Sequence, residues 1–235
     1  MTDHDSHTGQ AEPHKEHNCF LSTADIFQDL TPADIEDIDR TLSIREVSKG
    51  HIIYMPEDTG EVLFILKTGR VQLYRLSADG RKLVLSILRP GSIFGEMSIV
   101  GQGMRETFAE AAEDSVVCVM RRQDLERLIL NRPQVALRLV SVIGQRLTET
   151  EGRLRDIAFK SVSGRVASLL LRLAPEGSAE IEGFTHQEIS EIVGTYRETT
   201  TQTLNEFRGR GLIEIGRKRI RILDAKELRR VAEQD

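Results

Sequence analysis

Arginine, glutamate and glutamine occur close together near residue 200 of this sequence. Arg197, Glu198, Thr201 and Gln202 are one to five positions apart, so a helix would place them on its first two turns. Arginine can pair with O6 and N7 of guanine, glutamate can accept a hydrogen bond from N4 of cytosine, and glutamine can pair with adenine. These residues could therefore read DNA bases. The alternatives are that Arg197 makes only a surface salt bridge and that Glu198 only caps its helix.

Two helix starts frame these residues. Thr185 with Glu188, and Thr195 with Glu198, each have the spacing of a capping box. The starts are ten residues apart and Gly194 precedes the second, so the first helix can only have about two turns. A short helix, a glycine turn and a longer helix predict a helix-turn-helix. Its core would be formed by Ile189, Ile192, Val193, Leu204 and Phe207.

A basic hairpin is expected directly after the second helix. Leu212–Glu214 and Arg219–Ile222 are predicted strands, and Gly216-Arg217-Lys218 would form the tip between them. Residues 207–221 hold six basic residues and one acid, although the whole chain has a net charge of −5. Residues 1–39 hold ten acids and one lysine, a net charge of −9, so the other 196 residues carry +4. The hairpin therefore reads as a wing that contacts phosphates, with a solvated charged surface as the alternative.

The region before residue 121 is rich in short β-type runs separated by turn residues. Such spacing predicts an antiparallel sandwich or barrel. The expected strands are His51–Met55, Val62–Leu66, Val71–Leu76, Lys82–Leu88 and Ser115–Met120. A short helix is expected before them, from the cap Thr31 and Pro32 to about Thr41.

A long helix is expected to begin at Pro133 and to end near Lys160. At about 27 residues it would be about 40 Å long, more than one small β domain can cover. The simplest way to bury its apolar stripe is a second copy of the chain, in a coiled coil. The alternative is packing within its own chain. The stripe comprises Val135, Leu139, Val142, Ile143, Leu147, Leu154 and Ile157.

With these segments placed, the sequence resembles the CRP/FNR family of bacterial regulators over about residues 20–223. Three groups of residues carry the resemblance, in the β-rich region, at the end of the long helix and in the helix-turn-helix. They are Lys49-Gly50, Gly69-Arg70-Val71 and Pro90-Gly91-Ser92-Ile93-Phe94-Gly95-Glu96; then Ile157-Ala158-Phe159 and Ser163-Gly164-Arg165-Val166-Ala167; then Thr185 to Gly194 with Arg197-Glu198-Thr199.

Residues 1–19 are polar with few apolar side chains, which predicts a disordered tail. For the rest of the chain the resemblance implies an α+β protein, in which a cyclic-nucleotide-binding-like antiparallel β-roll (a double-stranded β-helix or jelly-roll) covers 20–122. A helical linker with the dimerisation helix covers 123–160, and a winged helix-turn-helix covers 161–235. The implied function is sequence-specific binding to a palindromic DNA site as a homodimer. The implied partners are double-stranded DNA, a second copy of the chain and RNA polymerase.

The resemblance also assigns roles at the DNA interface. Arg197 and Glu198 fall on the family's base-reading positions, and Gln202 replaces an arginine of the cyclic-AMP-responsive members, so the target site should differ at that base. His186 either touches phosphate or has no role. The candidate phosphate contacts are Thr185, His186, Thr199, Thr200, Arg217 and Lys218. The apolar stripe of the long helix supplies the candidate dimer contacts, which are Leu139, Val142, Ile143, Leu147 and Leu154.

The family's effector pocket is only partly preserved. It holds cyclic AMP with residues that match Gly95, Glu96, Arg105 and Thr150 of this chain. Glu106 stands where a serine or threonine should contact the phosphate, and Glu151 stands where a helix serine should meet the adenine. Thr107 could supply the missing hydroxyl if the loop shifts by one residue. No cofactor is therefore expected, and DNA binding should not strictly require cyclic AMP; in the alternative, a cyclic nucleotide still binds.

Other classes of function find little support in the sequence. His4, His7, His14, His17 and Cys19 could bind a metal or a haem, but a plain disordered tail is favoured and no metal site is predicted. Cys19 and Cys118 belong to no CxxC pair. No nucleophile–base pair or glycine phosphate loop suggests an enzyme; a sensor module that has lost DNA binding is the other alternative. No membrane span or signal peptide is recognised, which predicts a cytosolic protein.

Overall fold

The computed structural model describes residues 21–22, 24–56, 58, 62–95, 107–174 and 178–233. The interpretation of the histidine-containing tail therefore lies outside the described residues. By internal contacts the chain divides into two units. The first comprises Met1–Val71 with Leu88–Val142, and the second comprises Gln72–Ile87 with Ile143–Asp235.

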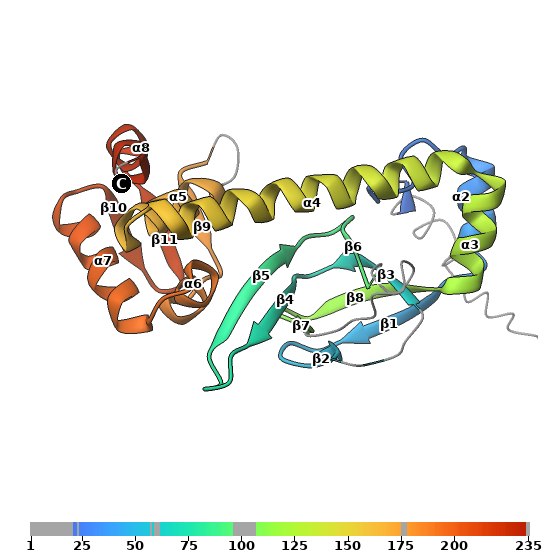
Figure 1. Ribbon diagram of the computed structural model, residues 1–235, viewed down its shortest axis with the longest axis horizontal. Coiled ribbons are helices and arrows are strands. Elements are labelled where there is room, and N and C mark those ends of the chain that lie inside the picture. Colours follow the sequence, from blue (N-terminus) through green and yellow to red (C-terminus); the bar gives the residue numbers. More distant parts are fainter. Residues whose placement is uncertain are drawn as a thin grey trace, which may run out of the picture. The chain divides into compact units, whose positions relative to one another are not determined.

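Two four-stranded sheets form the β-rich region, where the spacing of the short β-type runs predicts an antiparallel sandwich or barrel (Figure 1). One has the order β1 (Ser43–Val47), β8 (Ser115–Arg121), β3 (Val62–Thr68), β6 (Ile93–Phe94), and its pairs are antiparallel. The other has the order β2 (Ile52–Tyr54), β7 (Phe108–Ala111), β4 (Val71–Leu76), β5 (Lys82–Leu88). The rings of Tyr54, Phe64 and Phe94 cluster in the core of the first unit, with centroids 5.0 to 6.3 Å apart.

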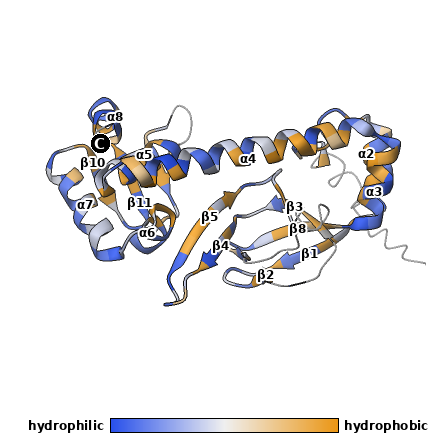
Figure 2. Ribbon diagram, viewed as in Figure 1, coloured by the Kyte–Doolittle hydropathy of each residue, from blue (hydrophilic) through white to orange (hydrophobic). Residues whose placement is uncertain are grey.

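Three helices flank these sheets in the sequence. The first, α2 (Pro32–Asp39), begins at the predicted cap Thr31, whose hydroxyl accepts a hydrogen bond from the Asp34 amide. The Asp34 carboxylate also accepts from Arg132, and that bond is the main reason why its pKa falls to about 2. Next come α3 (Arg122–Asn131) and the long α4 (Pro133–Phe159), which begins at Pro133 as predicted. Figure 2 shows hydrophobic positions recurring along α4.

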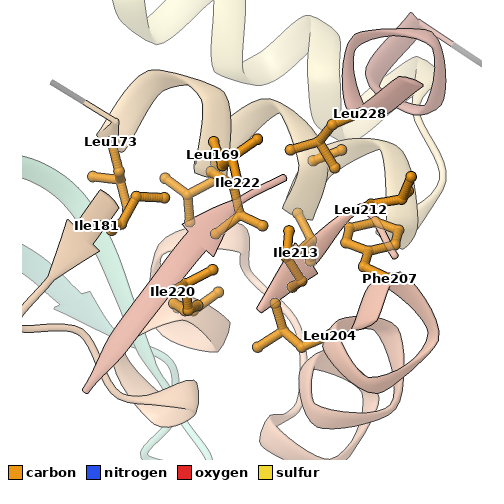
Figure 3. Packing of buried hydrophobic residues seen from close by; sticks show 14 of the residues in the cluster. Leu169, Leu173, Ile181, Leu204, Phe207, Leu212, Ile213, Ile220, Ile222 and Leu228 are labelled. Carbon is orange, nitrogen blue, oxygen red and sulfur yellow. The ribbon is translucent and has the colours of Figure 1, made fainter. Parts of the chain in front are cut away.

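The C-terminal part of the second unit combines four helices with a small sheet (Figure 1). The helices are α5 (Val162–Leu173), α6 (His186–Val193), α7 (Arg197–Gly209) and α8 (Ala225–Glu233). The sheet has the order β10 (Ile213–Gly216), β11 (Arg219–Ile222), β9 (Glu180–Glu182). Side chains from α5, α7, α8 and all three strands meet in one core (Figure 3). The predicted helix-turn-helix and wing are therefore present, whereas β9 and α8 were not predicted.

Candidate nucleic-acid interface and effector site

The turn between α6 and α7 has a defined geometry. The capping box that begins α6 is present, because the Glu188 amide donates to the Thr185 hydroxyl at 3.2 Å and the Thr185 amide donates to the Glu188 carboxylate at 2.7 Å. Gly194 adopts the left-handed conformation, with φ of 73°, that ends a helix without a side-chain clash. Arg165 of α5 donates a 3.2 Å hydrogen bond to the Val193 carbonyl and so supports the turn.

The start of α7 differs from the prediction. Tyr196, not Thr195, is the N-cap, and no side-chain hydrogen bond caps the helix. The predicted second capping box is therefore wrong. The Thr195 amide instead donates to the Ser190 carbonyl at 3.0 Å, because this residue still belongs to the turn. Arg197 and Glu198 consequently occupy the first two positions of the helix.

One face of α7 is exposed and the opposite face is buried. Arg197, Glu198 and Gln202 are exposed, and Thr199 and Thr201 are half-buried. The core side is formed by Thr200, Thr203, Leu204 and Phe207, spaced at i, i+3, i+4 and i+7. The candidate base-reading residues thus lie together on the solvent side of the first two turns.

The burial of Thr200 corrects one predicted phosphate contact. Its side chain is 0% exposed, so it cannot reach a phosphate. Its hydroxyl oxygen is buried without a hydrogen-bond partner among the described residues. Thr200 is therefore a core residue of α7, and Thr199 and Thr185 remain the threonines that can reach a DNA backbone.

His186 connects the two helices of the motif. Its Nδ1 lies 3.1 Å from the hydroxyl of Thr201, one of the candidate base-reading residues. Burial, and secondly the charge of Arg197, lower the pKa of the imidazole. At neutral pH His186 is consequently uncharged, and any contact it makes with a phosphate would be a neutral hydrogen bond.

The wing carries exposed cations at its tip. Arg217 and Lys218 form the two-residue turn between β10 and β11, and both are exposed. Lys218 has φ of 52°, the left-handed region that a lysine rarely adopts. Behind the tip, Arg219 and Arg221 pair with Glu180, at 3.0 and 3.8 Å. The tip arginine and lysine therefore project beyond residues whose charges are compensated within the sheet.

Comparison with known proteins agrees with this geometry. Residues 44–132 match the cyclic nucleotide-binding domain and residues 164–231 match the Crp-like helix-turn-helix domain. The chain is 33% identical over 220 residues to the CRP-like cAMP-activated global transcriptional regulator of Mycobacterium tuberculosis, and the match covers 91% of this chain and 98% of the relative. It is 31% identical over 210 residues to the cyclic AMP receptor protein of Thermus thermophilus, covering 88% and 96%.

The chain belongs to the CRP/FNR family. A solved CRP/FNR-family transcriptional regulator from Thermus thermophilus matches with a TM-score of 0.69 and 29% identity, covering 82% of this chain and 99% of the other. The family resemblance and the α+β fold class inferred from the sequence are thereby confirmed. The protein is a DNA-binding transcription regulator, and its family is one of regulators rather than enzymes.

The effector positions of the family are only partly described. Gly95 is buried with φ of 83°, and Thr107 is half-buried. On α4, Thr150 and Glu151 are exposed, and the Thr150 hydroxyl donates to the Arg146 carbonyl of its own helix at 2.8 Å. The remaining predicted pocket residues, Glu96, Arg105 and Glu106, lie outside the described residues.

The long helix exposes a regular apolar seam that sequence reasoning saw only in part. Val140, Leu147 and Leu154 are seven residues apart and 67%, 59% and 67% exposed. Val140 was missed, although the seven-residue spacing of a coiled coil was available as a signal. In contrast, Leu139 is only 9% exposed, so the structure corrects its assignment to the dimer contact; Val142 and Ile143 are half-buried.

Among the described residues, no helix is long and apolar enough to cross a membrane.

Proposed function

We propose that this regulator binds a two-fold symmetric DNA site as a homodimer, with α7 of each protomer in the major groove. The observation that carries the proposal is the division of α7 into a buried face and an exposed face that holds Arg197, Glu198 and Gln202. In helix-turn-helix proteins the first turns of the second helix meet the base edges. In this proposal Arg197 reads guanine, Glu198 accepts from cytosine and Gln202 pairs with adenine. Thr201 lies beside them and completes the reading surface.

The proposed phosphate contacts surround this helix. Thr185 and Thr199 are half-buried hydroxyl residues near the starts of α6 and α7, and His186 adds an uncharged imidazole. Arg217 and Lys218 supply positive charge at the wing tip. Phosphate contacts position a protein on DNA without reading its sequence, so these residues would provide affinity rather than specificity.

The exposed seam of α4 supports the homodimer. Three large apolar side chains at seven-residue spacing would otherwise remain in water, and burial of each leucine or valine contributes about 1.5–3 kcal/mol. A parallel pair of α4 helices would bury Val140, Leu147 and Leu154 together. A two-fold dimer then predicts two symmetric half-sites about one helical turn apart. RNA polymerase is the further partner that we propose from the family.

We propose further that DNA binding does not require cyclic AMP. Two relatives have names that refer to cyclic AMP: one is a CRP-like cAMP-activated regulator and the other is a cyclic AMP receptor protein. These names favour the opposite view, that cyclic AMP is required. This chain, however, carries Glu106 and Glu151 where the family places phosphate- and adenine-contacting hydroxyls. A carboxylate 4 Å from a phosphate charge costs about 4 kcal/mol at an effective dielectric near 20, and even half of that exceeds the gain from one hydrogen bond.

The test of base reading is a binding-site selection with wild type, Arg197→Ala and Lys218→Ala at two salt concentrations. A bidentate arginine–guanine pair contributes about 1–3 kcal/mol of discrimination, so Arg197→Ala should relax the consensus at one base pair in each half-site. Lys218→Ala should weaken binding to all sequences alike and flatten the salt dependence. If Arg197→Ala keeps the wild-type consensus and loses only overall affinity, Arg197 contacts the backbone and its proposed role is wrong.

A further inference from the structure

A cavity lies in the first unit, between helices α2 and α3. Its volume is about 250 Å³, and its lining comes from both helices, from the end of β8 and from the residue that links α3 to α4. Sites for small molecules have volumes of about 300 Å³ and more, so this cavity suits a small ligand. Gly95, Thr107 and Thr150, the described effector positions of the family, are not among its lining residues. The cavity is therefore separate from the effector pocket that the family resemblance implies.

The floor of the cavity is apolar. Ile38 of α2 and Met120 of β8 are buried, and Leu128 of α3 is half-buried. The methionine side chain is unbranched and polarizable, so it adapts to apolar groups of different shapes. An aliphatic or aromatic group that lies on this floor is removed from water, which favours binding.

A satisfied ion pair closes one side of the cavity. Nε of Arg132 donates to Oδ1 of Asp34 at 2.7 Å, and Oδ2 of Asp34 accepts from the Thr31 hydroxyl, also at 2.7 Å. The hydrogen bond from Arg132 is the main cause of the low pKa of the Asp34 carboxyl, about 2. Both oxygens of this carboxylate thus have donors within the protein, and the pair needs no ligand to satisfy it.

The other charged groups of the cavity are only weakly paired. Asp124 and Arg127, three residues apart on α3, approach to 3.8 Å, and Arg127 is exposed. Asp37 of α2 pairs with Arg40 at 3.2 Å, but both side chains are exposed. Ion pairs in contact with water contribute little free energy, so these groups can exchange their partners for those of a ligand at little cost. The cavity therefore presents carboxylates and a guanidinium together beside an apolar floor.

We propose that this cavity binds a small amino acid with an apolar side chain. The ammonium group of the ligand binds Asp124, with Asp37 as a second acceptor, and its carboxylate binds Arg127. The side chain of the ligand lies on the apolar floor. Each polar contact is a charge-assisted hydrogen bond, and the ligand replaces one long ion pair by two such bonds. The site does not depend on the proposed role of α7 in reading DNA.

The balance of charge around the cavity favours a zwitterion. The lining holds three carboxylates and two guanidiniums, and the guanidinium of Arg40 lies beside them, so the charges balance. An amino acid has no net charge and offers a partner to groups of both signs. A simple amine or a simple carboxylate would leave Arg127 or Asp124, respectively, without a partner on the ligand.

Methionine methyl NMR of the full chain tests the site. Met120 lines the cavity, whereas Met55 is exposed outside it and serves as the control signal. Met120→Leu identifies the Met120 signal. L-Leucine and L-phenylalanine are added up to about 10 mM, well above a millimolar dissociation constant. Both amino acids should shift the Met120 signal and leave the Met55 signal unchanged.

Two analogues of leucine test whether both of its charges are recognised. 3-Methylbutylamine lacks the carboxylate, and 4-methylpentanoate lacks the ammonium group, while both keep the apolar side chain. Each analogue should bind at least about twofold more weakly than leucine, because each loses one charged contact.

Matched variants assign each contact. Asp124→Asn removes the acceptor of the ammonium group, and Glu126→Gln removes an exposed carboxylate of the same helix outside the cavity. Arg127→Gln removes the donor to the carboxylate, and Arg121→Gln removes an exposed guanidinium outside the cavity. Asp124→Asn and Arg127→Gln should each weaken leucine binding about two- to fivefold, the range for one exposed charged contact, and the controls should bind as wild type does. Arg127→Gln should not weaken the binding of 3-methylbutylamine.

Absence of a Met120 shift with both amino acids overturns the proposal. Binding of either analogue as tight as that of leucine excludes recognition of a zwitterion and overturns it as well. Leucine binding that is unchanged in both Asp124→Asn and Arg127→Gln would place the ligand elsewhere. These outcomes concern the cavity alone, because binding-site selection tests the reading role of α7 separately.

Discussion

Thr200 shows how the position of a residue on a helix overrides its chemical type. A hydroxyl near base-reading residues suggests a phosphate contact, yet this one faces the core. The sequence contained the signal, because Thr200, Thr203, Leu204 and Phe207 follow the spacing of a buried helix face. The two threonines were not recognised as part of that face because they are polar.

The burial of Thr200 leads to a stability prediction. Thr200→Val replaces a hydroxyl that lacks a partner among the described residues by a methyl group of similar size, and should stabilise the protein by about 1 kcal/mol. Thr203→Val is the matched control, because the Thr203 hydroxyl donates to the Thr199 carbonyl at 3.0 Å. That change should destabilise by about 1 kcal/mol. Urea unfolding measures both; a loss of stability in Thr200→Val would show that its hydroxyl is satisfied.

His186 should make stability depend on pH in a narrow window. Its pKa is lowered in the folded protein, so the unfolded chain binds the proton more strongly. The free energy of unfolding should therefore decrease as the pH falls below about 6.5, the ordinary histidine pKa, and level off below the folded pKa. Carboxylates such as Asp34, with its pKa of about 2, lose their contribution only at lower pH.

The measurement compares wild type with His186→Gln by urea unfolding above, at and about one unit below the ordinary histidine pKa of about 6.5. Glutamine keeps a hydrogen-bonding group beside Thr201 but does not titrate in this range. Below the ordinary histidine pKa, the free energy of unfolding should decrease less in His186→Gln than in wild type. Equal decreases in the two proteins would mean that this imidazole has the same pKa in the folded and unfolded states.

Among the elements, α4 makes the sharpest prediction. Leu147→Lys with Leu154→Lys places two charges in the exposed seam and should give monomers in sedimentation. Gln145→Lys with Glu149→Lys adds two lysines to exposed positions of the same helix outside the seam and should leave the dimer intact. A dimeric seam variant would place the interface elsewhere on the protein.

Element prediction succeeded where several local signals agreed. Strands β4 and β5 coincide with predicted β-type runs that are bounded by turn residues, and the cap at Thr31 and the proline at Pro133 begin α2 and α4 as expected. The strands that were not predicted, β1, β6, β7 and β9, have two to five residues each. Helix α8 is mostly charged, and its Leu228, Val231 and Ala232 contact the core through one narrow stripe. Such segments derive their structure from tertiary contacts rather than from local preference.

At the scale of the whole molecule, titration calorimetry with cyclic AMP tests whether the effector is needed. Wild type should not bind cyclic AMP with a dissociation constant in or below the micromolar range, and cyclic AMP should not increase its affinity for DNA. Glu106→Ser with Glu151→Ser restores the hydroxyls of the family pattern and should gain measurable binding. Micromolar or tighter binding by wild type, with a matching increase in DNA affinity, would establish cyclic AMP dependence instead.

The long-range contacts of the molecule could not be predicted from the sequence. Arg81 and Tyr196 are 115 residues apart, and nothing in either local pattern indicates that they meet. The sequence also could not predict which residues of α4 are buried. Apolar spacing identifies a stripe along the helix, but it does not show which part of that stripe is covered by other segments of the same chain. Leu139 and Leu147 belong to one predicted stripe, yet the first is buried and the second is 59% exposed.

At Lys218 the requirements of protein stability and of DNA binding differ, because its backbone is left-handed and its side chain is a cation. A lysine in this conformation costs about 1–2 kcal/mol relative to the right-handed region, a cost that glycine escapes. Selection for thermostability alone would thus favour glycine at the wing tip. The same replacement would remove a cation from the surface that we propose meets DNA. At the wing tip, a substitution that increases stability would therefore weaken DNA binding. A consensus-guided redesign of this protein should leave Lys218 unchanged.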